Sequence, residues 1–209
     1  MRAPPPRATI ALVAVTSLAW LISSSGGLDD VTALIAGFIP ARASGAATVP
    51  GALPFLLTPL SATLVHAGII HLGFNMLMLG FCGRMVEVAL GRWGVVLLYL
   101  LGAYAAAAAQ YAVDPTSPVP MVGASGAISA LVGAYALLVG QRRARALGPI
   151  SGEIVHVLWL AAAWIGLQLL LNYAATGEGA MIATAAHVGG FIVGLVLARP
   201  ILRFRYRNA

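Results

Sequence analysis

Residues 56–81 read LLTPLSATLVHAGIIHLGFNMLMLGF, a long apolar run that contains no Asp, Glu, Lys or Arg. A helix needs about 20 apolar residues to cross a bilayer, so this stretch is long enough to span one. It also carries His66, His71 and Asn75, whose polar side chains are costly in hydrocarbon unless they find partners. The run therefore predicts a membrane helix that contributes polar groups to the interior of the protein.

The composition of the whole chain also indicates a membrane protein. Of its 209 residues, 60% are hydrophobic and 9% are charged, and the mean hydropathy is +0.94; a soluble domain has about 25% charged residues. The apolar runs are continuous rather than alternating, which excludes a transmembrane β-barrel. We predict an all-α polytopic membrane protein with six transmembrane helices. The other five runs are Ala8–Ile22, Trp93–Val113, Ala124–Gly140, Val155–Tyr173 and Ala180–Leu197.

The basic residues predict the orientation of these helices. All 12 are Arg, and with a cytoplasmic N-terminus only Arg42 falls on the external side, in agreement with the positive-inside rule. The N- and C-termini are then both cytoplasmic, and the protein lies in the cell (inner) membrane. Because the Arg residues sit in short clusters between apolar runs, we predict the lipid bilayer as their partner and no binding of nucleic acid.

This orientation divides the chain into three parts. Residues 1–7 form a cytoplasmic tail, residues 8–198 the membrane domain, and residues 199–209 a basic cytoplasmic tail. The first run fits a retained span or a cleaved signal peptide, and we interpret it as a span because the rest of the chain is embedded in the membrane. Residues 26–54 form a long external loop with a predicted interfacial helix that starts at Asp29. Its apolar face comprises Val31, Leu34, Ile35 and Phe38.

Two further polar clusters point to nucleophilic chemistry. The fourth run begins Gly123-Ala124-Ser125-Gly126-Ala127, and the sixth contains Ala186-His187-Val188-Gly189-Gly190. Ser125 lies in the first turn of the fourth helix, and His187 about seven residues into the sixth, roughly 10 Å deep at 1.5 Å per residue. Small residues let the two helices approach closely. A serine hydroxyl needs a base to take its proton, so we predict a Ser125–His187 dyad.

Acyl transfer also requires donors for the developing oxyanion. The candidates are the Ser125 backbone N–H, the Asn75 amide and the His71 ring, since His71 and Asn75 share one helix face. Gly123, which lacks a side chain, would let the substrate backbone come close. The acidic residues all lie in loops or at the ends of runs, so the sequence predicts a dyad without a carboxylate.

Taken together, these motifs resemble the rhomboid family of intramembrane serine proteases. The matching pieces are His66-x4-His71-x3-Asn75, Gly123-Ala124-Ser125-Gly126 and Ala186-His187-x2-Gly190-x3-Gly194, with Glu87 followed by Leu90-Gly91. The resemblance covers residues 55–198. It implies a six-helix rhomboid fold, Ser125 as nucleophile, His187 as general base, and His71 with Asn75 in the oxyanion hole. It also implies transmembrane protein substrates and an active site that opens to the external, periplasmic side.

The sequence departs from the family pattern at two places. The Trp-Arg pair of the first external loop is replaced by Leu57-Thr58, so we expect this loop to be anchored differently. An aromatic residue often follows the nucleophile by four positions and packs on the base. Here that residue is Ser129, which we expect to hydrogen-bond within its own helix.

Other interpretations remain open at this stage. His71 and His187 could hold a haem between two helices, or the chain could be an inactive rhomboid-like binding protein. We predict no cofactor and no metal, because there is no HExxH motif or paired cysteine, and nothing specifies the oligomeric state. Several polar residues have structural interpretations: His66 as a hydrogen-bonding residue, Glu87 as the ion-pair partner of Arg84 or Arg92, and Gln110, Gln168 and Asn172 as interhelical hydrogen-bonders.

Overall fold

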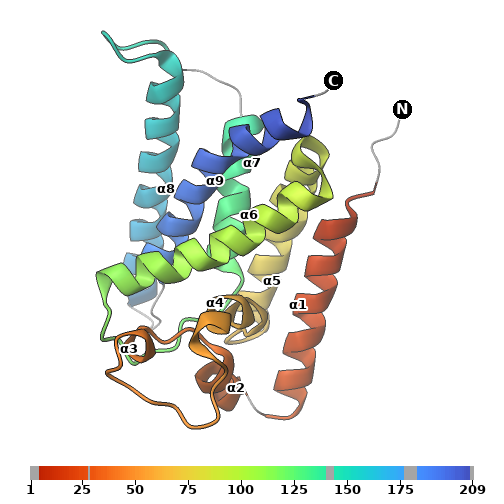
Figure 1. Cartoon of the computed structure of the whole chain (residues 1–209), viewed down its shortest axis with the longest axis vertical. Coiled ribbons are helices and arrows are strands. Elements are labelled where there is room, and N and C mark those ends of the chain that lie inside the picture. Colours follow the sequence, from red (N-terminus) through yellow and green to blue (C-terminus); the bar gives the residue numbers. More distant parts are fainter. Residues whose placement is uncertain (1–4, 28, 140–143, 177–182, 208–209) are drawn as a thin grey trace.

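The computed structural model describes residues 5–27, 29–139, 144–176 and 183–207, and the described part is helical (Figure 1). The α-helices are α1 Arg7–Ser25, α2 Asp29–Ala36, α3 Pro40–Ala43, α4 Thr58–Ser61, α5 Ile69–Met78, α6 Arg84–Val113, α7 Ser125–Leu138, α8 Gly152–Thr176 and α9 Thr184–Arg205. The 3-10 turns η1 Phe55–Leu57 and η2 Ala62–Leu64 flank α4, and the π-helical turn η3 Leu79–Gly83 joins α5 to α6.

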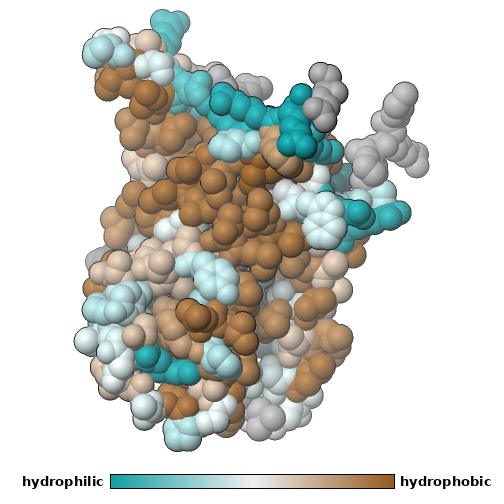
Figure 2. Space-filling model, in the orientation of Figure 1, coloured by the Kyte–Doolittle hydropathy of each residue, from teal (hydrophilic) through white to brown (hydrophobic). Residues whose placement is uncertain are grey.

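Four of the described helical segments are long and apolar enough to cross a membrane: Arg7–Ser25, Ile69–Val113, Gly152–Leu170 and Thr184–Arg205. On the face shown, apolar residues cover much of the middle of the molecule, and hydrophilic residues gather at the end where α1 begins and α9 ends (Figure 2). Short helices α2, α3 and α4 lie at the opposite end. The chain is therefore an integral membrane protein, as the sequence predicts.

The core is built where α6, α7 and α9 pack against one another. Small residues bring the backbones of α7 and α9 together: a Cβ atom added at Gly190 would overlap the carbonyl oxygen of Gly126, and one added at Gly194 would overlap that of Ala130. On the neighbouring face, a Cβ atom at Gly189 would lie 2.5 Å from the Cβ atom of Ala109 on α6. Small residues at a helix interface permit this close approach.

The run 56–81 does not form one helix. It splits into the turns η1, α4 and η2, an irregular stretch over residues 65–68, and α5, so that His66 precedes the helix. Pro59 lies in the first turn of α4, where its missing N–H is tolerated, and the backbone becomes extended at Val65. Hydropathy cannot reveal this break, because irregular backbone is tolerated at membrane depth where it is buried in protein, and Thr58, Ala62 and Thr63 are buried.

The residues between the second and third predicted spans, Gly83–Arg92, are also helical for most of their length. Helix α6 starts at Arg84 and changes direction at Gly91, which has a φ of 76°. A positive φ strains residues that carry a Cβ atom, so glycine suits this kink. At the other end of the chain α9 continues to Arg205 instead of ending near Leu197. The predicted start of that span at Ala180, and Arg142 and Arg143, lie outside the described residues.

The loop between α1 and α5 is held by hydrogen bonds between side chains and backbone carbonyl groups. The Tyr104 hydroxyl on α6 donates to the carbonyl oxygen of Leu56 over 2.9 Å. The Ser61 hydroxyl donates to Ala36 O at the end of α2 over 2.6 Å. Helix α2 forms where the sequence predicts a short helix, but Phe38 lies beyond it, is buried and packs on Phe55. Phe38 thus belongs to the protein interior.

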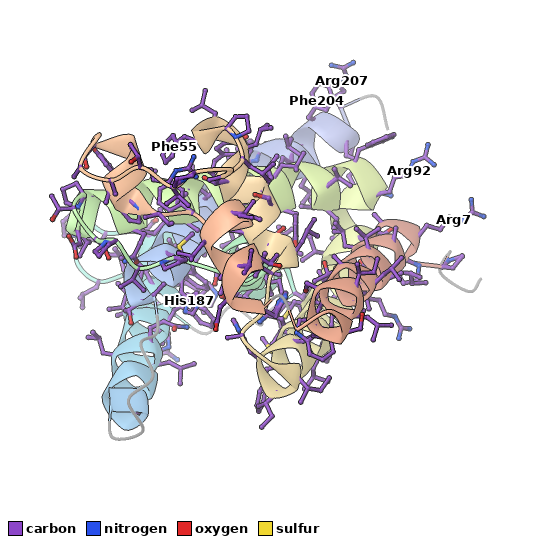
Figure 3. All side chains as sticks on the ribbon, turned by 90° about the horizontal axis from the view of Figure 1, so that it is seen from below. Arg7, Phe55, Arg92, His187, Phe204 and Arg207 are labelled. Carbon is purple, nitrogen blue, oxygen red and sulfur yellow. The ribbon has the colours of Figure 1, made fainter. Side chains whose placement is uncertain are left out.

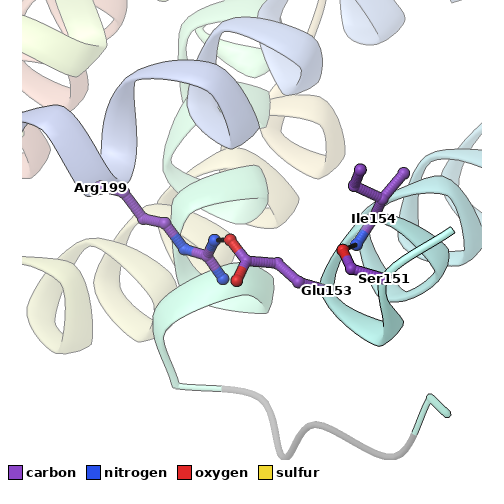
Figure 4. A network of polar contacts seen from close by, with 4 residues as sticks. All are labelled: Ser151, Glu153, Ile154 and Arg199. Atoms are coloured by element: carbon purple, nitrogen blue, oxygen red, sulfur yellow. Dashed lines mark hydrogen bonds and ion pairs between the residues drawn. The ribbon is translucent and has the colours of Figure 1, made fainter. Parts of the chain in front are cut away.

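Polar contacts also join elements at the arginine-rich end. Arg199 of α9 forms an ion pair with Glu153 in the first turn of α8 (Figure 4). The Arg205 guanidinium donates to Val88 O over 3.0 Å, just before the kink at Gly91.

Glu87 is the buried carboxylate at this end, and its partners differ from those that the sequence suggests. Instead of an arginine, it binds the start of α1: it accepts hydrogen bonds from Ala8 N–H at 2.9 Å, Thr9 N–H at 2.8 Å and the Thr9 hydroxyl at 2.7 Å. Helix α1 has Pro6 at its N-cap, which makes no side-chain cap. Glu87 therefore caps α1 from α6, where a negative charge also suits the helix dipole.

Replacing the Glu87 carboxylate should weaken the attachment of α1 to α6. We expect Glu87→Gln to lower the free energy of unfolding by about 1–3 kcal/mol, because a buried N–H loses its acceptor and the charge at the helix terminus is lost. The matched control is Asp30→Asn, which removes an exposed carboxylate on α2 and should stay within about 0.5 kcal/mol of the parent. Unfolding in mixed micelles measures both; equal stabilities for the two variants would contradict the capping role.

Candidate active site

The side chains of Ser125 and His187 meet where two helices begin. His187 Nε2 lies 2.6 Å from Ser125 Oγ. Ser125 is the first residue of α7, and His187 lies in the first turn of α9, less deep than the sequence suggests because α9 begins at Thr184. His187 sits within the bundle, whereas Arg7, Arg92 and Arg207 point away from it (Figure 3).

The segment before Ser125 is hydrogen-bonded to residues that precede and follow α4. Phe38 and Met121 exchange two backbone hydrogen bonds of 3.0 and 2.8 Å, and Gly123 N–H donates to Ala62 O over 2.9 Å. His66 takes part as well, because its Nε2 atom accepts a hydrogen bond of 3.4 Å from Ala124 N–H. His66 is buried and thus has a structural contact, as the sequence suggests. These bonds fix the point at which α7 starts.

Gly123 and His71 lie against each other beside the serine. Gly123 has a φ of 110°, and a Cβ atom there would lie 2.7 Å from His71 Cε1 and 3.7 Å from Ser125 Oγ. A side chain at this position would therefore be strained and would collide with the imidazole. The ring of His71 also meets that of His66, with centroids 5.1 Å apart.

Asn75 follows His71 by one turn of α5. Its Nδ2 atom donates to the carbonyl oxygen of His71 over 2.9 Å, and the residue is buried. An amide nitrogen carries two hydrogens, so one N–H remains for a further acceptor. The N–H of Ser125 itself also has no acceptor within α7, because the first residues of a helix lack one. The structure thus gathers three of the predicted site residues, Ser125, His187 and His71, around Gly123, with Asn75 one turn along α5.

Ser129 and Gln168 complete the surroundings of the pair. The Ser129 hydroxyl donates to Ser125 O over 2.7 Å, which confirms the expected bond within its own helix. On α8, Gln168 Oε1 lies 2.7 Å from His187 Nδ1, and Gln168 is 3% exposed. The sequence interpretation of Gln168 as an interhelical hydrogen-bonder is confirmed, but its contact with the histidine ring was missed. An amide in an otherwise apolar run was the available signal; the side chain of Asn172 lies outside the described part.

A serine hydroxyl held against an imidazole can be activated as a nucleophile. Such a pair inside a bundle of membrane helices has the architecture expected of an intramembrane serine hydrolase. The chain belongs to the rhomboid family, because the Rhomboid domain matches residues 56–204.

Several rhomboid proteins are similar to this chain. Rhomboid protease GlpG of Pectobacterium atrosepticum is 29% identical over 192 residues, covering 91% of this chain and 61% of the relative. Rhomboid-related protein 2 of Mus musculus is 31% identical over 144 residues, covering 68% and 47%. Rhomboid protease GluP of Bacillus subtilis is 32% identical over 146 residues, covering 70% and 25%. The chain thus spans between a quarter and three fifths of these relatives.

Family membership and the geometry of the site also bear on whether the chain is a haem-binding protein. The match includes the segments that carry His71, Ser125 and His187, and two of these relatives are named as rhomboid proteases. A haem-binding protein is not favoured, since His187 has both ring nitrogens engaged, one by Ser125 and one by Gln168.

Proposed function

We propose that this protein is an intramembrane serine endopeptidase in which Ser125 is the nucleophile and His187 the general base. The observation that carries the proposal is the 2.6 Å contact between Ser125 Oγ and His187 Nε2. It is the contact through which a neutral imidazole takes the hydroxyl proton as the oxygen attacks.

The reaction follows from this contact. Ser125 Oγ attacks the carbonyl carbon of the scissile peptide bond while its proton moves to His187 Nε2, giving a tetrahedral oxyanion. The C–N bond then breaks, and His187 returns the proton to the leaving amine, which leaves an acyl ester on Ser125. Water, deprotonated by His187, hydrolyses the ester and restores the serine.

The oxyanion needs donors that are already in place. We assign this role to the Ser125 backbone N–H, the free N–H of Asn75 and the His71 ring, which lies against Gly123. Fixed donors of this kind lower the barrier by about 3–4 kcal/mol each. Gly123 leaves room for the substrate backbone next to Ser125, because a side chain there would fill the space between Ser125 Oγ and His71.

The proposed topology has six spans. The kink at Gly91 divides the helical segment Ile69–Val113 into two spans: the first comprises α5, η3 and the start of α6, and the second the remainder of α6. Helix α7 is a further, shorter span of 14 residues. The arginine-rich end faces the cytoplasm under the positive-inside rule, which places residues 1–7 and 199–209 there and residues 8–198 in the membrane domain. The active site then opens towards the external side of the inner membrane.

The substrates are membrane-anchored proteins. Hydrolysis needs water, and both Ser125 and His187 lie at the starts of their helices, near the external end in this orientation. A regular helix hides its peptide groups in backbone hydrogen bonds, so the substrate helix must be weak there. Gly, Ser or Pro close to the external boundary provides that weakness. Cleavage should occur at this boundary and release the external part of the substrate.

Labelling with a fluorophosphonate tests the proposed nucleophile directly. The purified protein in detergent should acquire one covalent phosphonyl group, and tandem mass spectrometry should place it on Ser125. The control is Ser129→Ala, which removes the buried serine one turn further along the same helix and should leave labelling intact. Labelling at another residue, or unchanged labelling of Ser125→Ala, would show that the proposed nucleophile is wrong.

A further inference from the structure

The ring of His187 is held on the side that faces away from Ser125. Its Nδ1 atom lies 2.7 Å from Gln168 Oε1, and its Nε2 atom lies 2.6 Å from Ser125 Oγ. Gln168 is 3% exposed and comes from α8. The three side chains therefore form a continuous line from α8 through α9 to α7.

We propose that Gln168 is the positioning residue for His187 and the third member of a Ser125–His187–Gln168 triad in which an amide takes the place of the usual carboxylate. This inference rests on the proposed function, since it assigns a partner to the general base.

The chemistry of the amide oxygen defines what Gln168 does. A carbonyl oxygen can only accept a hydrogen bond, so the Nδ1 atom of His187 must carry the hydrogen. In a neutral imidazole only one nitrogen is protonated, and the other is left with its lone pair. The bond to Gln168 therefore leaves Nε2 free to accept the Ser125 proton. When His187 takes that proton, the Nδ1–H stays in place and donates to Gln168 throughout.

The membrane setting explains why an amide suits this position. A carboxylate would stabilise the imidazolium more strongly, but an ionised side chain within a membrane span is costly when unpaired. A glutamine fixes the tautomer and the ring orientation without adding a charge to α8. The amide dipole points its negative end at Nδ1, so it still favours the protonated ring in the transition state.

Helix α8 also donates a hydrogen bond to the backbone of His187. Trp164, one turn before Gln168, donates from Nε1 to the carbonyl oxygen of His187 over 3.4 Å. Its ring stacks on Phe191 of α9, with centroids 5.0 Å apart and an angle of 9° between the planes. Gln168 and Trp164 lie four residues apart and so share one face of α8. This face holds both the ring and the backbone of His187.

The position after the nucleophile supports the same assignment. Ser129 is turned towards its own helix, and its Cβ atom lies 3.2 Å from the place that a Cβ atom at Gly190 would occupy. Ser129 carries no ring that could pack on His187. The support that the base needs comes from α8 instead.

The test compares three variants by steady-state cleavage of a transmembrane substrate in liposomes. Gln168→Met keeps the length of the side chain and removes the strong acceptor; kcat should fall about 10- to 100-fold with KM within about twofold of the parent, because the lost contact acts on the chemical step. Gln168→Glu retains an acceptor oxygen and should keep kcat within about fivefold. The matched control Gln110→Met makes the same change on α6 and should leave kcat unchanged.

A second measurement reports the hydrogen bond without using activity. The chain has four histidines, so 15N NMR of the rings can be assigned by comparison with His187→Ala. In the parent protein, His187 should be protonated at Nδ1 and not at Nε2, and Gln168→Met should lose this preference. This measurement also decides the matter if Gln168→Met folds poorly, because the tautomer is read in the parent.

The inference would be overturned by a parent-like kcat for Gln168→Met, by an equal loss in Gln168→Glu or Gln110→Met, or by an Nε2-protonated His187. Failure of the proposed function has a different signature, in which the parent protein is not labelled at Ser125 and Ser125→Ala still cleaves the substrate. A parent that is labelled, together with an unaffected Gln168→Met, would reject the positioning role alone.

Discussion

Ser125→Ala and His187→Ala should each abolish proteolysis of a model transmembrane substrate, with kcat falling by at least about 10⁴-fold. The alanine at position 125 removes the attacking oxygen. The alanine at position 187 leaves the hydroxyl protonated, and a neutral serine is a poor nucleophile. Since the two groups act in the same step, the double variant should be about as inactive as either single variant.

Reconstitution in liposomes with a substrate whose helix carries Gly or Pro near one face measures this effect. Mass spectrometry of the products should place the cut at the external boundary of the substrate helix. Both variants should insert into the membrane. Ser125→Ala should unfold at a temperature close to that of the parent, whereas His187→Ala should unfold at a somewhat lower one, because it leaves a cavity and the buried Gln168 amide without its partner. Cleavage by either variant at the parent rate would reject the dyad, and cuts at the cytoplasmic boundary would reject the proposed orientation.

The extent to which sequence predicts this fold differs between its elements. The regions of α1, α7, α8 and α9 follow from continuous apolar runs. Within the described residues α1, α8 and α9 contain segments with the length and composition of spans, whereas α7 is shorter. The division of run 56–81 could not be predicted, because hydropathy counts apolar residues and does not register whether the backbone around Pro59 and His66 is regular. Its irregular backbone is compatible with the membrane because it is buried against α6 and the segment before α7.

The candidate site could also be predicted only in part. Ser125, His187 and His71 could be singled out because polar side chains are expensive in a membrane span, and small residues show which helices can approach. The contact of Gln168 with His187 could not be predicted, since it depends on the rotation of α8 about its axis. Likewise the capping of α1 by Glu87 depends on a packing of two helices whose contacting residues lie 78 and 79 positions apart.

The close packing of α7 and α9 predicts a second large effect. Gly190 lies one turn after His187, and Gly126 directly follows Ser125, so the interhelical contact at these glycines sets the position of the dyad. In Gly190→Ala, the added Cβ atom would overlap Gly126 O and would also lie 3.1 Å from Gly126 C and 3.2 Å from Ser129 Cβ. A backbone carbonyl cannot turn aside as a flexible side chain can, so α9 must move away from α7.

Such a shift should act on both stability and activity. Overpacking of this kind costs about 1–3 kcal/mol, and a displacement of about 1 Å at the reacting groups lowers the rate about 100-fold. We therefore expect Gly190→Ala to unfold at a lower temperature and to lose at least about 100-fold in kcat, even where the remaining protein is folded. The fluorophosphonate reaction with Ser125 should slow in parallel, because both reactions need the same Ser–His contact.

A matched glycine separates this effect from that of the substitution itself. Gly166 on α8 is exposed, and a Cβ atom there meets nothing within 4 Å. Gly166→Ala should therefore keep the parent kcat and gain up to about 1 kcal/mol from the better helix propensity of alanine. A Gly190→Ala protein as active as Gly166→Ala would show that α9 can be displaced without moving His187. The dyad would then be held mainly from α8, through Gln168 and Trp164, rather than by the glycine contact with α7.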